Sequence, residues 1–474
     1  MKYIDMRYTY YLLILLSLLI FQVSCDDNSI FENENPYADV DEYLSYIEQS
    51  PQRKGDSELG KEYLLNGDYV NSGIPANLFR LVFPDGDNLL NREGKSIDLP
   101  FDYNQVSNPN GIEVVSPNCM QCHAGFVNNE FVVGVANMNV DFTFDNSAIS
   151  SLLNLQIQNM YGIDSPEYKA YFPFHQAINK AGGFLITETV GSNSADKLAL
   201  VLGAHRDGET LEWVDDAQYE IPEEVIPADV PAWWLLKKKN AMFSTGIGRG
   251  DFGRIMMASS VLTLKDTSEA RLTDEQFINV AEYIKQLEAP SYPEAIDTDL
   301  ASKGKLLFEA SCSKCHGTYG EDEFYPNIIV DQALLQTDSL LTKSNFAYQS
   351  FAYWYNNSWF SKGEFGGKLV PGNGYLAPPL DGIWATAPYL HNGSVPSLEA
   401  VLNSEKRPKY WRREPSNSDY DFDILGIYFS TEMSKIDKFT FDTTLPGYSN
   451  NGHYFANFMT DSEKNSILEY LKML

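Results

Sequence analysis

The chain has 474 residues, enough for two or three domains that each bury a core. Hydrophobic residues make up 43% and aromatic residues 13% of it, which is normal for a globular protein and excludes a largely disordered one. Its 65 acidic and 35 basic residues give a net charge of −30, which argues against nucleic acid or anionic lipid as a partner, because both would repel it.

A targeting segment is expected at the N-terminus. Two basic residues precede the apolar run 11–21, which is shorter than the about 20 residues of a membrane span. Residues 1–24 resemble a bacterial lipoprotein signal with Cys25 as the lipidated residue. Gln22 departs from the usual leucine, so an ordinary cleaved signal remains the alternative. Either way, the mature chain is expected outside the cytoplasmic membrane, in the periplasm or lipid-anchored at the cell surface.

The segment after the signal is expected to be a flexible tether. Residues 26–43 are acidic and poor in the apolar residues that form a core. Such a composition cannot bury enough surface to fold by itself. We therefore expect a tether over residues 25–50.

Four of the five cysteines occur in two copies of one pattern, Cys-x-x-Cys-His. Disulfides are the usual expectation for an exported protein, and zinc is another. A zinc site built from both pairs would need far closer spacing, about 15–20 residues. Covalent haem explains each position, because cysteines three apart face one side of a helical turn and the next histidine reaches the iron. The pattern predicts two covalently attached haems c, on Cys119, Cys122 and His123 and on Cys312, Cys315 and His316.

Amphipathic helices are expected around the second motif. In residues 300–317, the apolar side chains of 306–308 lie on a helix that runs into the motif. This stretch resembles the opening of class I cytochrome c domains, in which a Gly-Lys-x-x-Phe-like helix leads into the haem motif. Those domains close with a second amphipathic helix, and residues 459–474 fit it, with a capping box formed by Thr460 and Glu463.

A near copy of this closing helix precedes the second motif. Residues 272–287 also begin with Thr-Asp and carry Glu-Tyr-Ile-Lys-x-Leu in the same register. Pro290 and Pro293 then end the helix and mark a linker. Unless the two helices are unrelated, the fold is mainly α, with two tandem class I cytochrome c-like haem domains inflated by long loops, over residues 51–290 and 291–474.

A loop rich in Pro and Gly suggests a sixth ligand for the second haem. The stretch 384-WATAPYLHNGSVPSLEAVL-402 resembles the Ala-Pro-Tyr-(Phe/Leu)-His-(Asp/Asn)-Gly-Ser-Val-Pro-(Ser/Thr)-Leu segment of the di-haem cytochrome c peroxidase/MauG superfamily. It is most similar to the branch that contains the rubber oxygenases, where that histidine is a distal haem ligand. The resemblance implies that His391 is the sixth ligand of the second haem, and Met433 and Met459 are the other candidates.

The first haem is expected to lack this ligand. Aligning residues 243–246 with 390–393 puts Ser244 at the position of the histidine, and a hydroxyl is a poor iron ligand. The first haem would then accept oxygen or peroxide. His175 and His205 remain as ligands from elsewhere, or as ordinary surface or core histidines.

The resemblance also implies a reactive N-terminal haem and a C-terminal haem that relays electrons. Trp233 and Trp234 lie between the two motifs and are the candidate relay, as a tryptophan is in the superfamily. Buried aromatic packing is the alternative.

Several residues near Ser244 are candidates for the reactive pocket. Peroxidases of the superfamily show a Phe-Trp-Asp-Gly-Arg-like segment followed by an acid or amide that helps break the O–O bond. This chain has Phe-Ser-Thr-Gly instead, and Asp251 is the only nearby acid. We expect Asp251 and Arg249 as catalytic candidates, with Phe243 and Phe252 lining the pocket or packing in a core.

Basic side chains are candidates for pairing with haem propionates. Lys237, Lys238 and Lys239 form a basic cluster, and Arg249 and Arg254 follow it. Arginine binds carboxylates through its planar fork. A solvated basic face is the alternative.

Three functions remain open. The first is a di-haem peroxidase that reduces hydrogen peroxide at the N-terminal haem, with electrons from a small redox protein, a cytochrome or cupredoxin, relayed by the C-terminal haem. A basic protein of this kind would be attracted to an acidic chain. The second is a rubber-oxygenase-like dioxygenase acting on an apolar organic substrate with O2, and the third is a lipid-anchored electron carrier that is not an enzyme. The peroxidases would also suggest a calcium ion between the domains, but no compact acidic loop calls for one.

Overall fold

The computed structural model describes residues 30–347, 349–415 and 418–474. The expected signal, residues 1–24, and Cys25 lie outside the described residues. Of the described residues, helices hold 39% and strands 13%, and the strands form several small sheets. The fold is therefore mixed α/β, and the expectation of a mainly α fold is wrong. The strands are two to five residues long, too short for an alternating pattern to stand out in the sequence.

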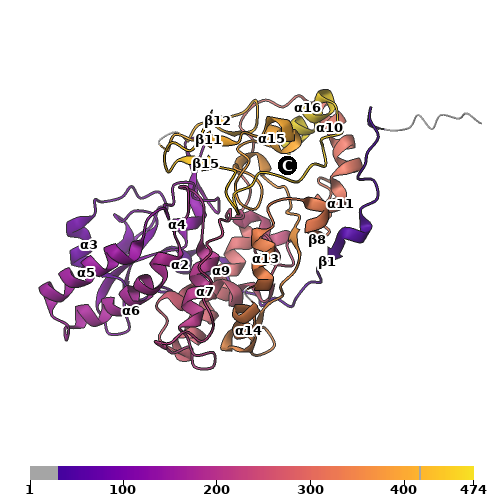
Figure 1. The fold of residues 1–474 in the computed structure, drawn as a ribbon. Helices are drawn as coiled ribbons and strands as arrows, with labels where there is room; N and C mark the ends of the chain where they lie inside the picture. Colours follow the sequence, from indigo (N-terminus) through magenta and orange to yellow (C-terminus); the bar gives the residue numbers. More distant parts are fainter. Residues whose placement is uncertain (1–29, 348, 416–417) are drawn as a thin grey trace, which may run out of the picture.

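The N-terminal half carries the elements up to α9, seen in indigo to magenta in Figure 1. Its α-helices are α2 (Ser57–Asn66), α3 (Ala76–Val82), α4 (Met120–His123), α5 (Asn146–Tyr161), α6 (Pro166–Ala181), α7 (Ala195–Ala204), α8 (Phe252–Met256) and α9 (Thr267–Gln286). Its short 3-10 helices are η1 (Asp41–Tyr43), η2 (Gly94–Ser96), η3 (Gly182–Phe184), η4 (Trp233–Lys238) and η5 (Met257–Leu262). Its strands are β1 (Leu44–Tyr46), β2 (Ile74–Pro75), β3 (Tyr103–Ser107), β4 (Glu113–Pro117), β5 (Ala124–Val127), β6 (Glu130–Val133) and β7 (Gly248–Gly250).

The C-terminal half follows a connection over residues 287–297. Its α-helices are α10 (Thr298–Ser311), α11 (Ser313–His316), α12 (Gln332–Leu335), α13 (Leu340–Ala347), α14 (Gln349–Asn357), α15 (Leu398–Leu402) and α16 (Asp461–Leu471). Its 3-10 helices are η6 (Trp359–Ser361), η7 (Ile383–Ala385) and η8 (Ser404–Lys406). Its strands are β8 (Ile328–Asp331), β9 (Gly367–Leu369), β10 (Gly374–Leu376), β11 (Tyr410–Arg412), β12 (Tyr420–Asp421), β13 (Gly426–Ile427), β14 (Ser430–Thr431) and β15 (Thr440–Asp442).

The predicted helices around the second motif are confirmed. α10 runs into this motif with Leu307 and Phe308 buried, although Leu306 is 57% exposed. α16 is the predicted closing helix, and the capping box between Thr460 and Glu463 is present. α9 is the closing helix predicted in the N-terminal half, and it begins several residues earlier than its pattern suggested.

A glycine lets each closing helix approach an earlier helix of its own half. α16 packs on α10, and α9 packs on α2. A Cβ atom on Gly304 would lie 1.8 Å from the carbonyl oxygen of Ser466, and a Cβ on Gly60 would lie 2.0 Å from that of Asn279. Only glycine permits so close an approach of two backbones. The two halves therefore share one helix-packing arrangement.

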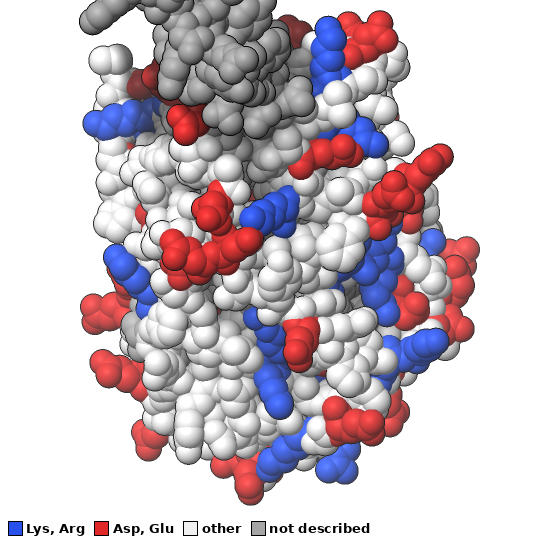
Figure 2. Space-filling view, turned by 90° about the vertical axis from the view of Figure 1, so that its right-hand side faces the viewer, with Lys and Arg blue, Asp and Glu red and all other residues white. Residues whose placement is uncertain are grey.

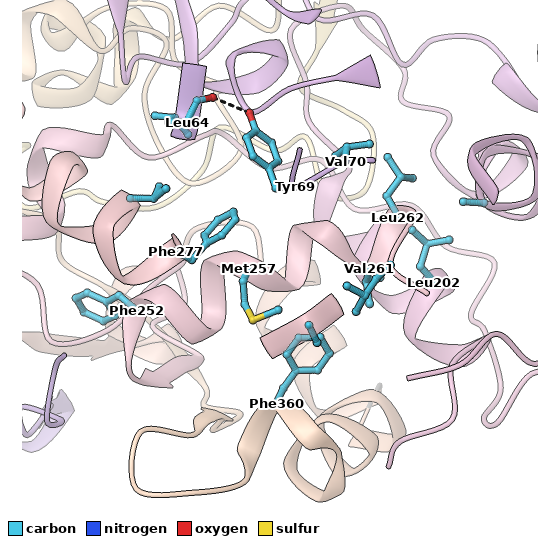
Figure 3. Packing of buried hydrophobic residues seen from close by; sticks show 14 of the residues in the cluster. Leu64, Tyr69, Val70, Leu202, Phe252, Met257, Val261, Leu262, Phe277 and Phe360 are labelled. Carbon is cyan, nitrogen blue, oxygen red and sulfur yellow. Dashed lines mark hydrogen bonds between the residues drawn. The ribbon is translucent and has the colours of Figure 1, made fainter. Parts of the chain in front are cut away.

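The two halves also exchange segments. The N-terminal core, shown in Figure 3, contains Phe252 and Phe277 and also takes up Tyr355 and Phe360 from the C-terminal half. The C-terminal core includes Phe308, Trp384 and Leu468, and it takes up Trp234 from η4. Two small sheets join the halves as well, because β7 pairs with β9 and β1 pairs with β8. η1 and β1 lie within the segment expected to be a tether.

The surface seen in Figure 2 carries both signs of charge. Acidic and basic side chains are interspersed among uncharged ones over the uncovered part of this face. No helix in the described ranges combines the length and the apolar character that a membrane span requires.

Candidate haem sites

The two Cys-x-x-Cys-His motifs form the same single helical turn. In the first, the amide of His123 donates to the carbonyl of Cys119 at 3.0 Å, and in the second the amide of His316 donates to the carbonyl of Cys312 at 3.0 Å. The hydroxyl of Tyr69 accepts from the amide of Cys119 at 3.3 Å and donates to the carbonyl of Leu64 at 2.9 Å, so the N-terminal core fixes the start of the first turn (Figure 3). Each turn presents its cysteines and histidine as covalent haem attachment requires.

The four cysteines are half-buried, free thiols. Burial raises the pKa of Cys119, Cys122 and Cys315 to about 11 and that of Cys312 to about 12. In the described ranges, no three His, Cys, Asp or Glu side chains gather where they would hold a metal ion. The disulfide and zinc alternatives thus find no support in this arrangement.

His123 packs against the first of the two tryptophans. Its ring stacks on Trp233 with centroids 4.5 Å apart and an angle of 23°. Its Nδ1 is buried without a hydrogen-bond partner, and burial lowers the pKa of the ring to about 3. The imidazole is therefore neutral, as a metal ligand must be.

His316 is oriented by a backbone carbonyl. Its Nδ1 lies 2.8 Å from the carbonyl oxygen of Pro378, so Nδ1 carries the proton and donates. Burial lowers the pKa of this ring below its usual value. A hydrogen bond of this kind sets the tautomer that leaves Nε2 free for iron.

A second imidazole, that of His453, lies close to His316. The two ring centroids are 6.2 Å apart at an angle of 56°. A histidine nitrogen binds a metal at roughly 2 Å, and the ring centre lies roughly 1 Å behind that nitrogen, so two imidazoles on one iron have centroids about 6 Å apart. The spacing of His316 and His453 therefore matches a pair of axial ligands.

The loop that carries His453 is held firmly. Arg407 donates at 2.7 Å to the carbonyls of Asn450 and Gly452, and the amide of His453 donates to the carbonyl of Leu335 at 2.7 Å. The Nδ1 of His453 is buried without a partner, and burial, reinforced by the nearby His316, lowers its pKa to about 3. Sequence reasoning missed His453. The available signal was that it is the only histidine other than His391 between the second motif and the closing helix.

The side chain of His391, the expected sixth ligand, is engaged by a tyrosine. Its Nε2 lies 3.1 Å from the hydroxyl of Tyr375, and the two rings stack with centroids 4.1 Å apart. That hydroxyl donates to the carbonyl of Asp338 at 2.8 Å, which leaves its oxygen to accept from Nε2. Of the other candidates, Met433 is 94% exposed and Met459 lies in the C-terminal core.

The remaining histidines have partners of their own. Nδ1 of His175 lies 2.8 Å from the hydroxyl of Ser150, and Nδ1 of His205 lies 3.0 Å from the carbonyl oxygen of Val214. Among the ring contacts of the described residues, His123 has Trp233 and no imidazole. The two sites therefore differ, with paired imidazoles at the second and a single one at the first.

The two loops aligned in sequence have the same backbone. Residues 243–246 and 390–393 begin with φ 68° at Phe243 and φ 69° at Leu390, and end with φ 62° and φ 66° at their glycines. Isolated bridges close both, Met242 with Gly248 and Tyr389 with Val395. This geometry supports the register that puts Ser244 opposite His391.

Each loop is also held by the other half. The carbonyl of Ser244 accepts from the amide of Leu376 at 2.8 Å, and the carbonyl of His391 accepts from the amide of Asp229 at 2.7 Å. Leu376 and Asp229 each lie the same distance upstream of the loop in their own half. The contact is therefore reciprocal.

The other residues expected in the reactive pocket have structural partners. Both oxygens of Asp251 are engaged, since Oδ1 accepts from Arg53 at 2.6 Å and caps α8, and Oδ2 accepts from the amide of Arg53 at 3.0 Å. Phe252 is buried in the N-terminal core, and the ring of Phe243 lies against Gly248. The Nη1 atom of Arg249 is buried without a partner.

Most of the expected propionate partners are already paired with protein carboxylates. Lys237 binds Glu288 at 2.8 Å, and Lys238 binds Asp381 at 2.7 Å and also Glu323. Arg254 binds Asp274 at 2.8 Å and stacks on Trp359. Lys239, by contrast, forms no ion pair with a carboxylate among the described residues.

Trp233 and Trp234 face different sites. Trp233 lies on the ring of His123, and Trp234 is buried in the C-terminal core, where its Nε1 donates to the carbonyl of Asp381 at 2.8 Å. The segment 378–381 also carries the Pro378 carbonyl that accepts from His316. A continuous series of contacts therefore runs from His123 to His316.

The residues at both motifs fit haem c. Each has two free thiols beside a neutral imidazole, and no hydrogen bond of the described residues engages Nε2 of His123 or His316, the atom that would bind iron. When bound, haem c supplies reversible electron transfer at its iron and, where one axial position is left free, a place for a small exogenous molecule.

Comparisons with known proteins agree with this chemistry. Residues 374–412, from β10 to β11, match the family model described as RoxA-like, cytochrome c-like. The chain is 30% identical over 253 residues to the uncharacterized protein y4iJ of Sinorhizobium fredii, covering 40% of this chain and 41% of that protein. It is 24% identical over 276 residues to the uncharacterized protein y4iM of the same organism, covering 53% of this chain and 62% of that protein.

The chain thus spans less than two thirds of the length of either relative. The matched range supports a c-type cytochrome of the rubber-oxygenase-like branch, implies haem c and suggests a haem oxidoreductase or oxygenase. It does not confirm the wider di-haem peroxidase/MauG superfamily.

Proposed function

We propose that this protein is a di-haem c-type oxidoreductase of the rubber-oxygenase-like kind, with one haem at each motif. Cys119 and Cys122 would hold the first and Cys312 and Cys315 the second, each through two thioether bonds. His123 and His316 would be the proximal ligands. The proposal extends the cytochrome c-like match of residues 374–412 to both motifs.

The contrast between the two histidine environments carries the proposal. The ring centroids of His453 and His316 lie 6.2 Å apart, whereas His123 has no imidazole among its ring contacts in the described residues. A haem with two axial histidines is suited to electron transfer, and one with a single histidine is suited to a small molecule. We therefore assign relay to the C-terminal site and small-molecule chemistry to the N-terminal site.

The protein side chains would orient both sites. The Nδ1–H of His316 donates to Pro378, which keeps Nε2 deprotonated and aims it. His123 lies against Trp233, and Trp234 continues the contact toward Pro378. We propose these two tryptophans as the route for electrons between the sites.

Oxygen chemistry on an apolar organic substrate is favoured over peroxide reduction. Peroxide reduction calls for a side chain that moves a proton, and both oxygens of Asp251 are held by Arg53 and by the start of α8. The first motif adjoins the N-terminal core, which includes Phe252, Met257 and Phe277. The RoxA-like, cytochrome c-like match of residues 374–412 supports the same choice.

The test is made on protein matured in a host that attaches haem c. Intact mass should show two added haems, and oxygen uptake should depend on an apolar substrate and need no electron donor. Peroxide turnover with a reduced small cytochrome, without substrate-dependent oxygen uptake, would contradict the oxygenase assignment. A protein with two haems that reacts with neither oxidant would be an electron carrier.

A further inference from the structure

Two partly buried basic side chains, Lys239 and Arg249, have no partner in the described part of the chain, and the Nη1 atom of Arg249 is fully buried. Burial lowers the pKa of Lys239 to about 8 and also lowers that of Arg249, and no hydrogen bond or ion pair of either side chain is present there. The other lysines and arginines whose pKa is lowered all donate to backbone carbonyls, and they are Arg92, Lys197, Arg206, Arg407 and Arg413. Lys239 and Arg249 are therefore exceptions.

The two cations lie at one end of a short hairpin. Met242 and Gly248 form its closing bridge. Lys239 lies three residues before Met242, and Arg249 directly follows Gly248. Met242 and Ile247 of this hairpin pack on the N-terminal core, as do Cys119 and Trp233. The hairpin and the first motif therefore pack on the same apolar core.

Unpaired buried cations are costly, which indicates an anionic partner. Removing a charge from water is unfavourable unless an opposite charge and hydrogen bonds compensate it. The neighbouring cations Lys237, Lys238 and Arg254 are already paired with Glu288, Asp381 and Asp274. Haem c carries two carboxylates, which matches the two cations left over.

We propose that Lys239 and Arg249 bind the two propionate carboxylates of the haem attached to Cys119 and Cys122. Arg249 acts through its planar fork and Lys239 as a point charge. The inference rests on the proposed function only in requiring haem at the first motif. Both are positioning residues, which seat the haem and set its reduction potential by compensating negative charge beside it.

The test is a spectroelectrochemical titration of each haem in the haem-loaded protein, without substrate. Lys239→Gln and Arg249→Gln should each lower the midpoint potential of the N-terminal haem, because an uncompensated carboxylate stabilises ferric iron. The low-spin C-terminal haem should keep its potential. Lys239→Arg and Arg249→Lys should restore the N-terminal value. Lys237→Gln is the matched control, since its partner Glu288 is largely exposed, and it should shift neither haem.

The outcomes separate the alternatives. An N-terminal potential that changes no more in the glutamine variants than in the control overturns the proposal, as does a shift of the C-terminal haem instead. Unchanged potentials would assign the cations to a carboxylate of another ligand. If a glutamine variant loses haem, retention of haem by the charge-keeping variants supports the proposal and its loss there overturns it. Wild-type protein without two haems would refute the proposed function itself.

Discussion

Replacing His453 by alanine should convert one haem of the two from low spin to high spin. The centroid of the His453 ring lies 6.2 Å from that of His316, the separation expected for two imidazoles on one iron. Its Nδ1 has no protein partner, so the substitution leaves no stranded hydrogen-bond donor or acceptor in the protein. Half of the total haem iron should therefore change from low spin to high spin, and the protein should remain folded.

Absorption and EPR spectra of the oxidised variant measure the change. Free imidazole should restore the low-spin signal, because the variant leaves a cavity of the size of the lost ring. His391→Ala is the matched control, since its Nε2 is bonded to Tyr375 and its loss removes a hydrogen bond worth about 1 kcal/mol without changing the spin state. A high-spin haem in His391→Ala, together with an unchanged spectrum in His453→Ala, would refute the assignment.

Three further predictions concern the frame around the sites. Gly304→Ala should destabilise the protein by about 2 kcal/mol or more in urea unfolding, because its Cβ would meet the backbone of α16, whereas Gly372→Ala, with open space around it, should change little. Asp274→Asn should cost about 3 kcal/mol, because Arg53 and Arg254 lose their shared carboxylate. Burial by itself would raise the pKa of Asp274, but hydrogen bonds from both arginines hold that pKa below its usual value. The stability that the ionised Asp274 contributes is therefore present above about pH 4 and is lost as the pH falls through the lowered pKa. Equal acid sensitivity of wild type and variant would contradict this prediction. Trp233→Leu should slow electron transfer between the haems in flash photolysis with haem content unchanged, and an unchanged rate would exclude the proposed route.

The sequence revealed the parts of the molecule that rest on local rules. A Cys-x-x-Cys-His turn needs only one helical turn, and the capping box of α16 needs only Thr460 and Glu463, so both were predictable. The loop register was predictable too, because a turn with two positive φ angles restricts residue choice locally.

Long-range pairing could not be predicted in the same way. Strands as short as β7 and β9 form only because segments from both halves meet, and neither carries a pattern of its own. The ion pair between Asp251 and Arg53 forms only when distant segments fold together. The same holds for the contact between His453 and His316. His391 was favoured because residues 384–402 resemble a family segment that carries a distal histidine, whereas His453 follows an ordinary Asn-Asn-Gly stretch.

Carbon monoxide titration of the reduced, haem-loaded wild-type protein tests the difference between the two sites most directly. His316 and His453 should together occupy both axial positions of one haem iron, so that it cannot bind carbon monoxide. The single imidazole of His123 should leave one position of the other iron available. We expect one equivalent of carbon monoxide bound for every two haems. Binding of two equivalents, or of none, would contradict the account.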